Sequence, residues 1–406
     1  MKRLIGILLI VTALSPLLLA SCLPGSTSVA TGWAGTTVQN GVVCAGTRVG
    51  RVVTANSSIG SIEWSYSFTV GAPSGGLSCA PTSSATALYA TPVMDGDMVY
   101  VGTYSGQVLA MSMAARGLNL TFPQQRYGEW EWDAPVYGGR SSAIVGDLLV
   151  TADSIYVNDS NGRVYSLDKE FGDPNWESPA LDEKYGKLWT SPAIRGDSLY
   201  VGTFDGHIYS LSAATGATLD WTFQSSTGFA SSPVLYGDTI FLGSFDRHLY
   251  AVRIGADEPT WTFPQDGPAG KWFWASPVIK DGIVYAGCLD GKIYAVNATT
   301  GKQIWFYATA DKNGGSSPIV SSPVLTDNFL LVANEGGNLY VFDLSGDEGQ
   351  QGIPSNAVVQ IGDTAAKVMS SFCAEDGFAY IRDENNSLYI VNISTGQVRP
   401  PIPLVG

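Results

Sequence analysis

The chain has 406 residues, of which only 14% are charged, whereas 47 are glycine and 11% are Phe, Trp or Tyr. This composition is typical of short strands joined by tight turns and argues against long helices. The formal net charge of −14 argues against a nucleic-acid-binding protein and against a polybasic lipid-binding face.

The first 22 residues have the pattern of an export signal. Lys2 and Arg3 precede an apolar run from Leu4 to Leu19, which is too short to span a bilayer comfortably. The run ends in Leu-Ala-Ser-Cys22, which resembles the bacterial lipobox. This resemblance implies cleavage before Cys22 and acylation of its thiol, so Cys22 is the predicted lipid attachment site. Because Leu rather than Asp follows Cys22, we expect sorting to the outer membrane if the organism has one, and otherwise anchoring to the cell membrane.

The rest of the chain is predicted to consist of eight copies of a sequence repeat of forty to fifty residues. Five copies begin at a Ser-Pro or Thr-Pro pair, whose prolines are Pro92, Pro192, Pro233, Pro277 and Pro323. Ala143 and Phe372 are aligned with those prolines in two degenerate copies. The remaining copy opens the domain around Trp33 to Gly46.

Each copy is predicted to form four short antiparallel strands. A two-residue turn of the Gly-Asp or Asp-Gly type follows the first strand, because such dipeptides supply the positive φ that tight hairpins need. We place these turns at Gly96-Asp97, Gly146-Asp147, Gly237-Asp238 and Asp281-Gly282. The third strand ends at a Thr-Gly turn, and the fourth strand carries a tryptophan: Trp64, Trp221, Trp261 or Trp305.

A sheet of four short strands cannot bury both of its faces alone, so the copies must pack face to face. Closing the series into a ring leaves only short outer edges exposed. We therefore predict an all-β fold, an eight-bladed β-propeller of four-stranded antiparallel blades. The predicted organisation is a cleaved signal peptide (1–21), a lipid-anchored tether and closing strand (22–30) and the propeller (31–406). The segment from Ser26 to Thr31 is expected to pair with the last blade.

The motifs Ser-Ser-Pro-Val, Tyr-Val-Gly-x-x-Asp-Gly and Thr-Gly-x-x-x-Trp resemble the quinoprotein (PQQ-like) propeller repeat. The layout as a whole is similar to the family of the B component of the outer-membrane β-barrel assembly machinery. That resemblance implies an eight-bladed scaffold without catalysis. It also implies that the repeat tryptophans, Trp176 among them, dock one blade against the next.

A second set of aromatic residues lies in the connections that lead from each fourth strand to the next first strand. In a propeller, these connections open on one face, around the central channel. Tyr89, Trp189 and Trp274 each stand three residues before a repeat proline, so the rotation of the ring should relate them. We consider two arrangements equally: an exposed protein-binding rim, or aromatic side chains that fold over and plug the channel mouth. The candidate rim residues are Tyr127, Trp130, Trp132, Trp189, Phe229, Trp272 and Trp274.

Residues for other chemistry are sparse. His207 and His248 occupy equivalent places at the start of a third strand, where other copies have Gln, Arg, Lys, Asn or Ser, so no metal site is predicted. The sequence leaves the disulfide state open: if any two cysteines pair, we expect Cys44 and Cys79 to do so, whereas Cys288 and Cys373 are expected to be buried thiols. The adjacent cysteine pair of quinoprotein dehydrogenases is absent.

The sequence thus predicts a non-catalytic, lipid-anchored scaffold on the outer face of a bacterial membrane. Its predicted partners are the membrane, through Cys22, and envelope proteins or peptides. A specific role in outer-membrane protein assembly is implied by the family resemblance alone. We expect no cofactor, no nucleic acid and a monomeric propeller. The alternative is an oxidoreductase that binds PQQ and Ca²⁺.

Overall fold

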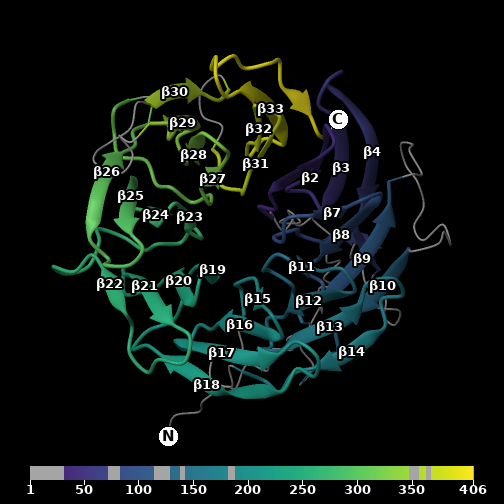
Figure 1. Cartoon of the computed structure of the whole chain (residues 1–406). Helices are drawn as coiled ribbons and strands as arrows, with labels where there is room; N and C mark the ends of the chain where they lie inside the picture. Colours follow the sequence, from purple (N-terminus) through teal and green to yellow (C-terminus); the bar gives the residue numbers. More distant parts are fainter. Residues whose placement is uncertain are drawn as a thin grey trace, which may run out of the picture.

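The computed structural model describes residues 32–71, 83–113, 129–137, 142–181, 188–311, 313–346, 356–362 and 367–405. Every regular element in these ranges is a β-strand. Eight four-stranded antiparallel sheets follow one another around a central opening, with the first strand of each sheet next to the opening and the fourth strand at the perimeter (Figure 1). The predicted eight-bladed propeller is confirmed. The predicted closing segment, Ser26 to Thr31, lies outside the described residues.

Consecutive strands of the sequence are neighbours within each of the first four blades. Blade 1 contains β1 (Thr36–Gln39), β2 (Val42–Gly46), β3 (Arg51–Asn56) and β4 (Ser61–Ser67). Blade 2 contains β7 (Val93–Asp95), β8 (Met98–Gly102), β9 (Gln107–Ser112) and β10 (Trp130–Asp133). Blade 3 contains β11 (Leu149–Val150), β12 (Ser154–Asn158), β13 (Val164–Asp168) and β14 (Pro174–Glu177). Blade 4 contains β15 (Ala193–Arg195), β16 (Ser198–Gly202), β17 (His207–Ser212) and β18 (Thr218–Gln224).

The same order continues through the second half of the ring. Blade 5 contains β19 (Val234–Tyr236), β20 (Thr239–Gly243), β21 (Leu249–Arg253) and β22 (Trp261–Phe263). Blade 6 contains β23 (Val278–Lys280), β24 (Ile283–Gly287), β25 (Lys292–Asn297) and β26 (Gln303–Ala308). Blade 7 contains β27 (Val324–Leu325), β28 (Phe329–Ala333), β29 (Asn338–Asp343) and β30 (Asn356–Gln360). Blade 8 contains β31 (Cys373–Glu375), β32 (Phe378–Arg382), β33 (Ser387–Asn392) and β34 (Ile402–Pro403).

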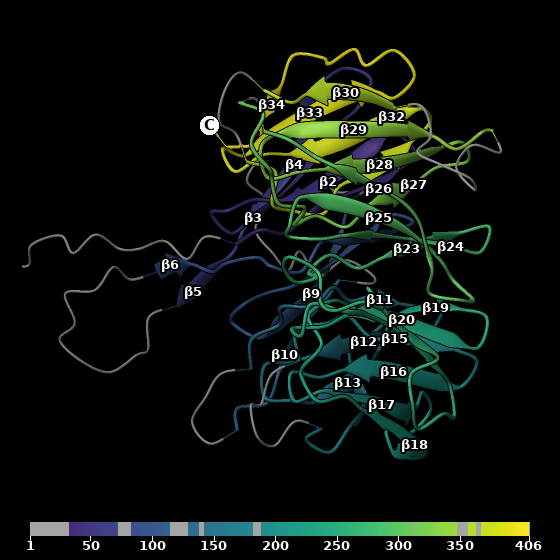
Figure 2. The ribbon, with the colours of Figure 1, turned by 90° about the vertical axis from the view of Figure 1, so that its left-hand side faces the viewer.

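A separate hairpin of β5 (Thr69–Gly71) and β6 (Ser83–Ala85) interrupts the connection between blades 1 and 2. It stands out from one face of the ring, on the left in Figure 2. Among the described residues, no helix has the length and apolar character needed to cross a membrane.

Blade 3 differs from the prediction in the register of its first strand. Leu149 pairs with Tyr156, as Ala193 pairs with Tyr200 in blade 4, so Leu148, and not Ala143, occupies the repeat-proline position. The turn between β11 and β12 is Ala152-Asp153, closed by the hydrogen bond from the Thr151 amide to the Ser154 carbonyl (2.9 Å). The predicted turn at Gly146-Asp147 is therefore wrong. Because Leu148 is buried like the repeat prolines, packing against the neighbouring blade sets this register.

The core lies between blades rather than within one of them. In the interface between blades 5 and 6, Phe241 and Leu249 of blade 5 pack in one cluster with Val284 and Tyr294 of blade 6. Each blade thus buries one face against the blade before it and the other face against the blade after it, which is the main source of stability for sheets of this size.

The repeat tryptophans add a hydrogen bond to each of several interfaces. Trp130, Trp176, Trp221 and Trp261 donate through Nε1 to a backbone carbonyl of the next blade, at Lys169 (3.0 Å) and at Ala213, Ala256 and Ala298 (2.9 Å each). The indole also packs against the turn glycine of that blade, since a Cβ on Gly301 would lie 2.6 Å from Cγ of Trp261. The docking role implied for Trp176, Trp221 and Trp261 agrees with this geometry, and Trp130 has the same role although the sequence did not predict it.

The ring closes between blade 8 and blade 1. Thr36 donates its amide to the Ser371 carbonyl (3.1 Å) and its hydroxyl to the Tyr380 carbonyl (2.8 Å). Arg382, only 2% exposed, donates to the Ala34 carbonyl through Nη2 (2.9 Å) and Nε (3.2 Å). This side chain stands where β8, β16, β20 and β24 end in glycine. Polar contacts thus join the two ends of the described chain.

The three cysteines among the described residues, Cys44, Cys288 and Cys373, are free thiols. Cys44 and Cys288 are buried, and Cys373 is half-buried. Burial raises the pKa of the Cys288 and Cys373 thiols to about 12, so both are protonated at neutral pH. Cys79, the predicted partner of Cys44, lies outside the described residues.

Candidate functional site

The connections of each blade alternate between the two faces of the ring. Since the strands are antiparallel, the turn from the second to the third strand lies on the same face as the connection from a fourth strand to the next first strand. Single backbone hydrogen bonds tie the two together: the Phe245 amide donates to the Gly228 carbonyl (3.0 Å), and the Leu289 amide donates to the Trp272 carbonyl (3.0 Å). We call this side of the ring the channel-mouth face.

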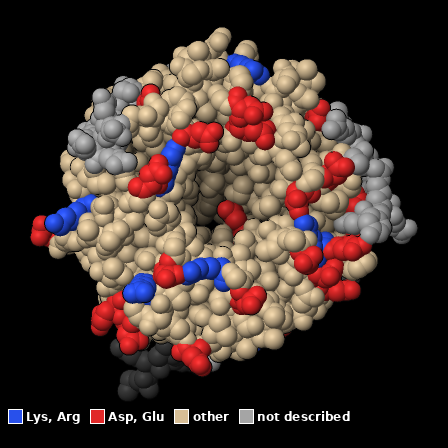
Figure 3. Space-filling model, viewed as in Figure 1, with Lys and Arg blue, Asp and Glu red and all other residues tan. Residues whose placement is uncertain are grey.

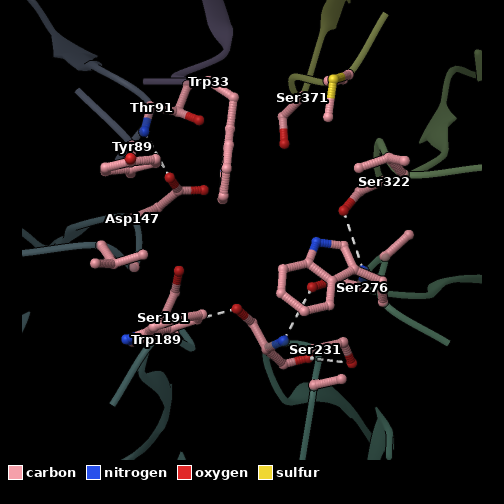
Figure 4. A pocket seen from close by; sticks show the side chains of 18 residues that line it. Trp33, Tyr89, Thr91, Asp147, Trp189, Ser191, Ser231, Ser276, Ser322 and Ser371 are labelled. Carbon is pink, nitrogen blue, oxygen red and sulfur yellow. Dashed lines mark hydrogen bonds between the residues drawn. The ribbon is translucent and has the colours of Figure 1, made fainter. Parts of the chain in front are cut away.

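A cavity of about 120 Å³ lies at the centre of the channel-mouth face (Figure 4). Two rings of repeat-equivalent residues surround it, each with one member per blade. The first, which we call the apolar ring, consists of Trp33, Tyr89, Val145, Trp189, Ala230, Trp274, Val320 and Met369. The second stands two residues later, and we call it the hydroxyl ring: Gly35, Thr91, Asp147, Ser191, Ser232, Ser276, Ser322 and Ser371.

Hydrogen bonds run from blade to blade along the hydroxyl ring. The amide of Ser191 donates to Oγ of Ser232 (2.8 Å), whose amide donates to Oγ of Ser276 (3.1 Å). The amide of Ser276 in turn donates to Oγ of Ser322 (3.1 Å). This explains the hydroxyl residue before the repeat proline in three blades: the side chains of Thr91, Ser232 and Ser276 each accept a hydrogen bond from one neighbouring blade while their amides donate to the other.

Asp147 is the one charged residue of the hydroxyl ring. Its Oδ1 accepts a hydrogen bond from the Thr91 amide (2.6 Å), so the carboxylate takes the structural place of a serine hydroxyl. Burial raises the pKa of Asp147, and hydrogen bonds from Thr91 oppose that rise. The side chain is half-buried and points into the cavity (Figure 4). Figure 3 shows the opposite face of the ring, with the hollow at its centre. No Lys or Arg of the described chain forms an ion pair with Asp147.

The predicted rim residues lie in different environments in the structure. Trp189 and Trp274 line the cavity, and Trp272, 43% exposed, lies on the surface beside it. Two residues are not available for recognition, which corrects the prediction: Phe229 is fully buried, and Trp130 is 7% exposed because it is the docking tryptophan of blade 2. Trp132 belongs to β10, where it packs on Tyr165 with ring centroids 5.0 Å apart. Tyr127 and Cys22 lie outside the described residues.

The rotational relation predicted for Tyr89, Trp189 and Trp274 is confirmed, since all three belong to the apolar ring. They line a cavity, while Trp272 is exposed, so the channel-mouth face combines features of the two arrangements considered from the sequence.

Sequence reasoning missed aromatic residues in the turns between second and third strands. Phe204 packs on Trp189 (centroids 4.9 Å apart) and on Phe245 (5.1 Å), which in turn packs on Trp272 (5.3 Å). On blades 1 and 2, Tyr89 lies between Trp33 (4.6 Å) and Tyr104 (5.2 Å). The sequence pattern that marks these residues is an aromatic residue directly before the turn dipeptide: Tyr104 before Ser-Gly, Phe204 before Asp-Gly and Phe245 before Asp-Arg. These contacts make two aromatic arcs, one across blades 4 to 6 and one across blades 1 and 2.

Acidic residues in the same turns have structural partners. The hydroxyl of Tyr250 donates to Oδ2 of Asp246 (2.6 Å), and that of Tyr294 donates to Oδ2 of Asp290 (2.7 Å). Burial and the neighbouring aspartate raise the pKa of each tyrosine, so the phenols stay protonated. Nδ1 of His207 lies 3.0 Å from Oδ1 of Asp205, and His248 repeats this arrangement. Within the described ranges, no three His, Cys, Asp or Glu residues come together as a metal site.

Comparison with known proteins gives the family. The model of the family described as outer membrane protein assembly factor BamB matches residues 20–178 and 172–399, which is most of the chain. The chain belongs to this family. A search of curated proteins finds no match to the sequence.

Solved structures confirm the fold. BamB from Moraxella catarrhalis is 16% identical, covers 88% of this chain and 93% of its own, and has a TM-score of 0.60. The computationally designed Ika8 protein is 13% identical with a TM-score of 0.63, and the two alignments cover 89% and 96% of the chains. The C-terminal WD40 domain of Sif2 is 12% identical with a TM-score of 0.64, covering 87% of this chain and 93% of that one.

Proposed function

We propose that the protein is a non-catalytic scaffold in outer-membrane protein assembly, lipid-anchored at Cys22, that docks envelope proteins on its channel-mouth face. The observation that carries the proposal is the match of the BamB family model over most of the chain. The geometry supports the choice of face, because both aromatic arcs and the central cavity lie there.

The exposed aromatic residues of this face suit protein recognition. Trp272 is 43% exposed and Tyr104 is 47% exposed, although each packs against another ring. Aromatic side chains held in place by neighbours offer a large contact area at a small cost in conformational entropy, which is why they are enriched at binding hot spots. A ring of eight blades packed against one another presents them on a rigid platform.

The proposed anchor would keep this face near the membrane. Trp33 lies in the apolar ring, so the chain enters the propeller at the channel-mouth face. Nine residues separate Cys22 from Gly32, and the ten residue-to-residue steps between them span at most about 35 Å when fully extended. A partner held at the same membrane would therefore meet the channel-mouth face at a high effective concentration.

Complementation tests the role. In cells that lack the gene, wild-type protein is expected to restore the level of folded outer-membrane β-barrel proteins, whereas a Trp272→Ala/Tyr104→Ala double variant does not. The matched control is Tyr236→Ala/Phe306→Ala, because these residues are similarly exposed (46% and 42%) but lie on the opposite face and the perimeter. Equal rescue by both double variants would contradict docking on the channel-mouth face.

The anchor and the absence of a cofactor are tested separately. Cys22→Ser should move the protein from the membrane fraction to the soluble fraction and abolish incorporation of labelled palmitate. Titration of the purified protein with PQQ and Ca²⁺, followed by absorbance, should give no saturable change. Stoichiometric binding of PQQ would instead support an oxidoreductase.

A further inference from the structure

The hydroxyl ring breaks its own pattern at one position that faces the cavity. Six of its eight members are Ser or Thr, whereas blade 3 contributes Asp147. A hydroxyl would satisfy the Thr91 amide just as well, as Thr91 itself does for the Gly35 amide (3.3 Å). The ring geometry therefore does not require a carboxylate, and a half-buried charge costs free energy unless it is paired. The packing and hydrogen bonds of the ring therefore do not explain why residue 147 is an aspartate.

A bound cation would give the Asp147 carboxylate an ion-pair partner. Asp147 has no ion-pair partner among the described residues, and its desolvation raises its pKa. A positive charge in the cavity would remove that penalty and stabilise the ionised carboxylate.

The surroundings of Asp147 favour a planar organic cation. Trp33, Tyr89, Trp189 and Trp274 line the same cavity, and Figure 4 shows the first three with Asp147 around one open space. The faces of Trp and Tyr attract cations. The serine hydroxyls of the ring offer further lone pairs to N–H donors. A guanidinium group stacks on aromatic rings, binds a carboxylate through two parallel hydrogen bonds and is always charged, whereas an ammonium group is a strongly hydrated point charge.

We propose that the cavity is a socket for an arginine side chain of a partner protein, with Asp147 as its counter-ion and the aromatic members of the apolar ring as its walls. The inference rests on the proposed function in one respect, namely that a protein docks on this face. The cavity size fits a side chain rather than a folded element, and its position at the centre of the face lets one arginine fix the register of a partner that contacts the aromatic arcs.

The socket can be tested without any partner. Full-length protein in detergent is titrated by calorimetry with N-acetyl-arginine N-methylamide, and in parallel with the citrulline analogue, which has the same shape without the charge. We expect saturable but weak binding of the arginine probe, with a Kd of roughly 1 mM, and no binding of the citrulline probe. Equal binding of both probes, or of neither, would overturn the proposal. Tighter binding of the corresponding lysine probe would also overturn it.

Variants assign the binding to Asp147. Asp147→Ser restores the residue of five other blades and should weaken binding of the arginine probe about tenfold or more. Asp257→Ser, which removes an exposed acid from the loop between β21 and β22, should leave it unchanged. Asp147→Asn serves as a second variant if Asp147→Ser unfolds, and a near-native thermal midpoint qualifies either one. Unchanged affinity in a folded Asp147 variant would overturn the socket. Failure of the socket is distinguishable from failure of the proposed function, because complementation by the Trp272/Tyr104 variant does not depend on Asp147.

Discussion

The interface between blades 5 and 6 and the interface between blades 8 and 1 both bury an apolar cluster, but they differ at the end of the second strand. In the first, β20 ends in Gly243, and Phe273 of blade 6 packs so closely that a Cβ on this glycine would lie 2.0 Å from the Phe273 carbonyl oxygen. In the second, β32 ends in the long Arg382, and the residue equivalent to Phe273 is Gly32. The small and the large residue at these two equivalent positions are thus exchanged between the two interfaces.

Both interfaces bury an apolar cluster, and the interface between blades 8 and 1 adds the buried hydrogen bonds of Arg382 to it. Within a continuous stretch, each interface is built from neighbouring residues and buries aromatic and aliphatic side chains. At the seam, the two ends of the propeller must find each other across the whole sequence. Arg382 and Glu375 hold them with directional hydrogen bonds, including one from the Gly41 amide to Oε2 of Glu375 (2.9 Å). Such bonds specify the register of closure as well as stabilising it.

The largest effect is expected in the apolar interface. Trp261→Ala removes a buried indole and its hydrogen bond to Ala298, and should lower the free energy of unfolding by about 4 kcal/mol. Trp272→Ala, at an exposed indole, should cost less than about 1 kcal/mol. Chemical denaturation of both variants measures the difference. Equal losses would mean that the repeat tryptophans do not dock the blades.

The next prediction separates two reasons for a turn glycine, its positive φ and its close contact with a neighbouring blade. Gly301 and Gly237 both have a positive φ (68° and 58°), but only Gly301 lies against a tryptophan of the preceding blade. Gly237→Ala should cost about 1 kcal/mol for the left-handed backbone alone. Gly301→Ala should cost about 3 kcal/mol, because the new methyl group also displaces Trp261. Similar losses in the two variants would refute the close contact.

A smaller loss is expected at the seam. Arg382→Met keeps much of the apolar stem but leaves the buried Ala34 carbonyl without its donors, which should cost about 2 kcal/mol. Hydrogen exchange should then show faster opening of β1 and β31 than of β19 and β23. Uniform destabilisation of all blades would contradict a local role in closure.

The smallest effect is a change in pH dependence. Burial raises the pKa of Asp147 in the folded state, so the folded protein binds this proton more tightly than the unfolded chain does. Its contribution to stability is therefore lost as the pH rises from about 4, the ordinary value for Asp, through the folded-state pKa. Asp147→Asn removes the titrating carboxyl group, so the variant does not lose this stability as the pH rises. Relative to wild type, the variant should be more stable at pH 7 than at pH 3.5 in urea unfolding experiments, and a difference independent of pH would show that Asp147 titrates normally.

The regular blades could be predicted from sequence because local signals agree there. Ser-Pro pairs, turn dipeptides and strand patterns recur at fixed spacing, and the rotational relation of Trp189 and Trp274 followed from that spacing. Blade 3 was misaligned because Ser141-Ser142-Ala143 and Gly146-Asp147 imitate the motifs of other blades. Only the packing of Leu148 against the neighbouring blade decides the register. The same error hid Asp147, which was predicted to be the second residue of a hairpin turn.

The prediction that Trp130 and Phe229 belong to the protein-binding rim was wrong for related reasons. Trp130 follows a long connection in place of the usual Thr-Gly turn, so nothing nearby marked it as the docking residue of a fourth strand. Phe229 lies one residue before the apolar-ring position, and that single step points its side chain into the core between blades 4 and 5 instead of toward the channel.

Site-specific crosslinking in living cells tests the central claim, docking on the channel-mouth face, most directly. A photoreactive amino acid is placed at Tyr104 or Trp272 on that face, and at Tyr236 or Phe306 elsewhere on the propeller. We predict discrete adducts with outer-membrane assembly proteins from the first two positions only. Adducts from Tyr236 or Phe306 with none from Tyr104 or Trp272 would contradict it.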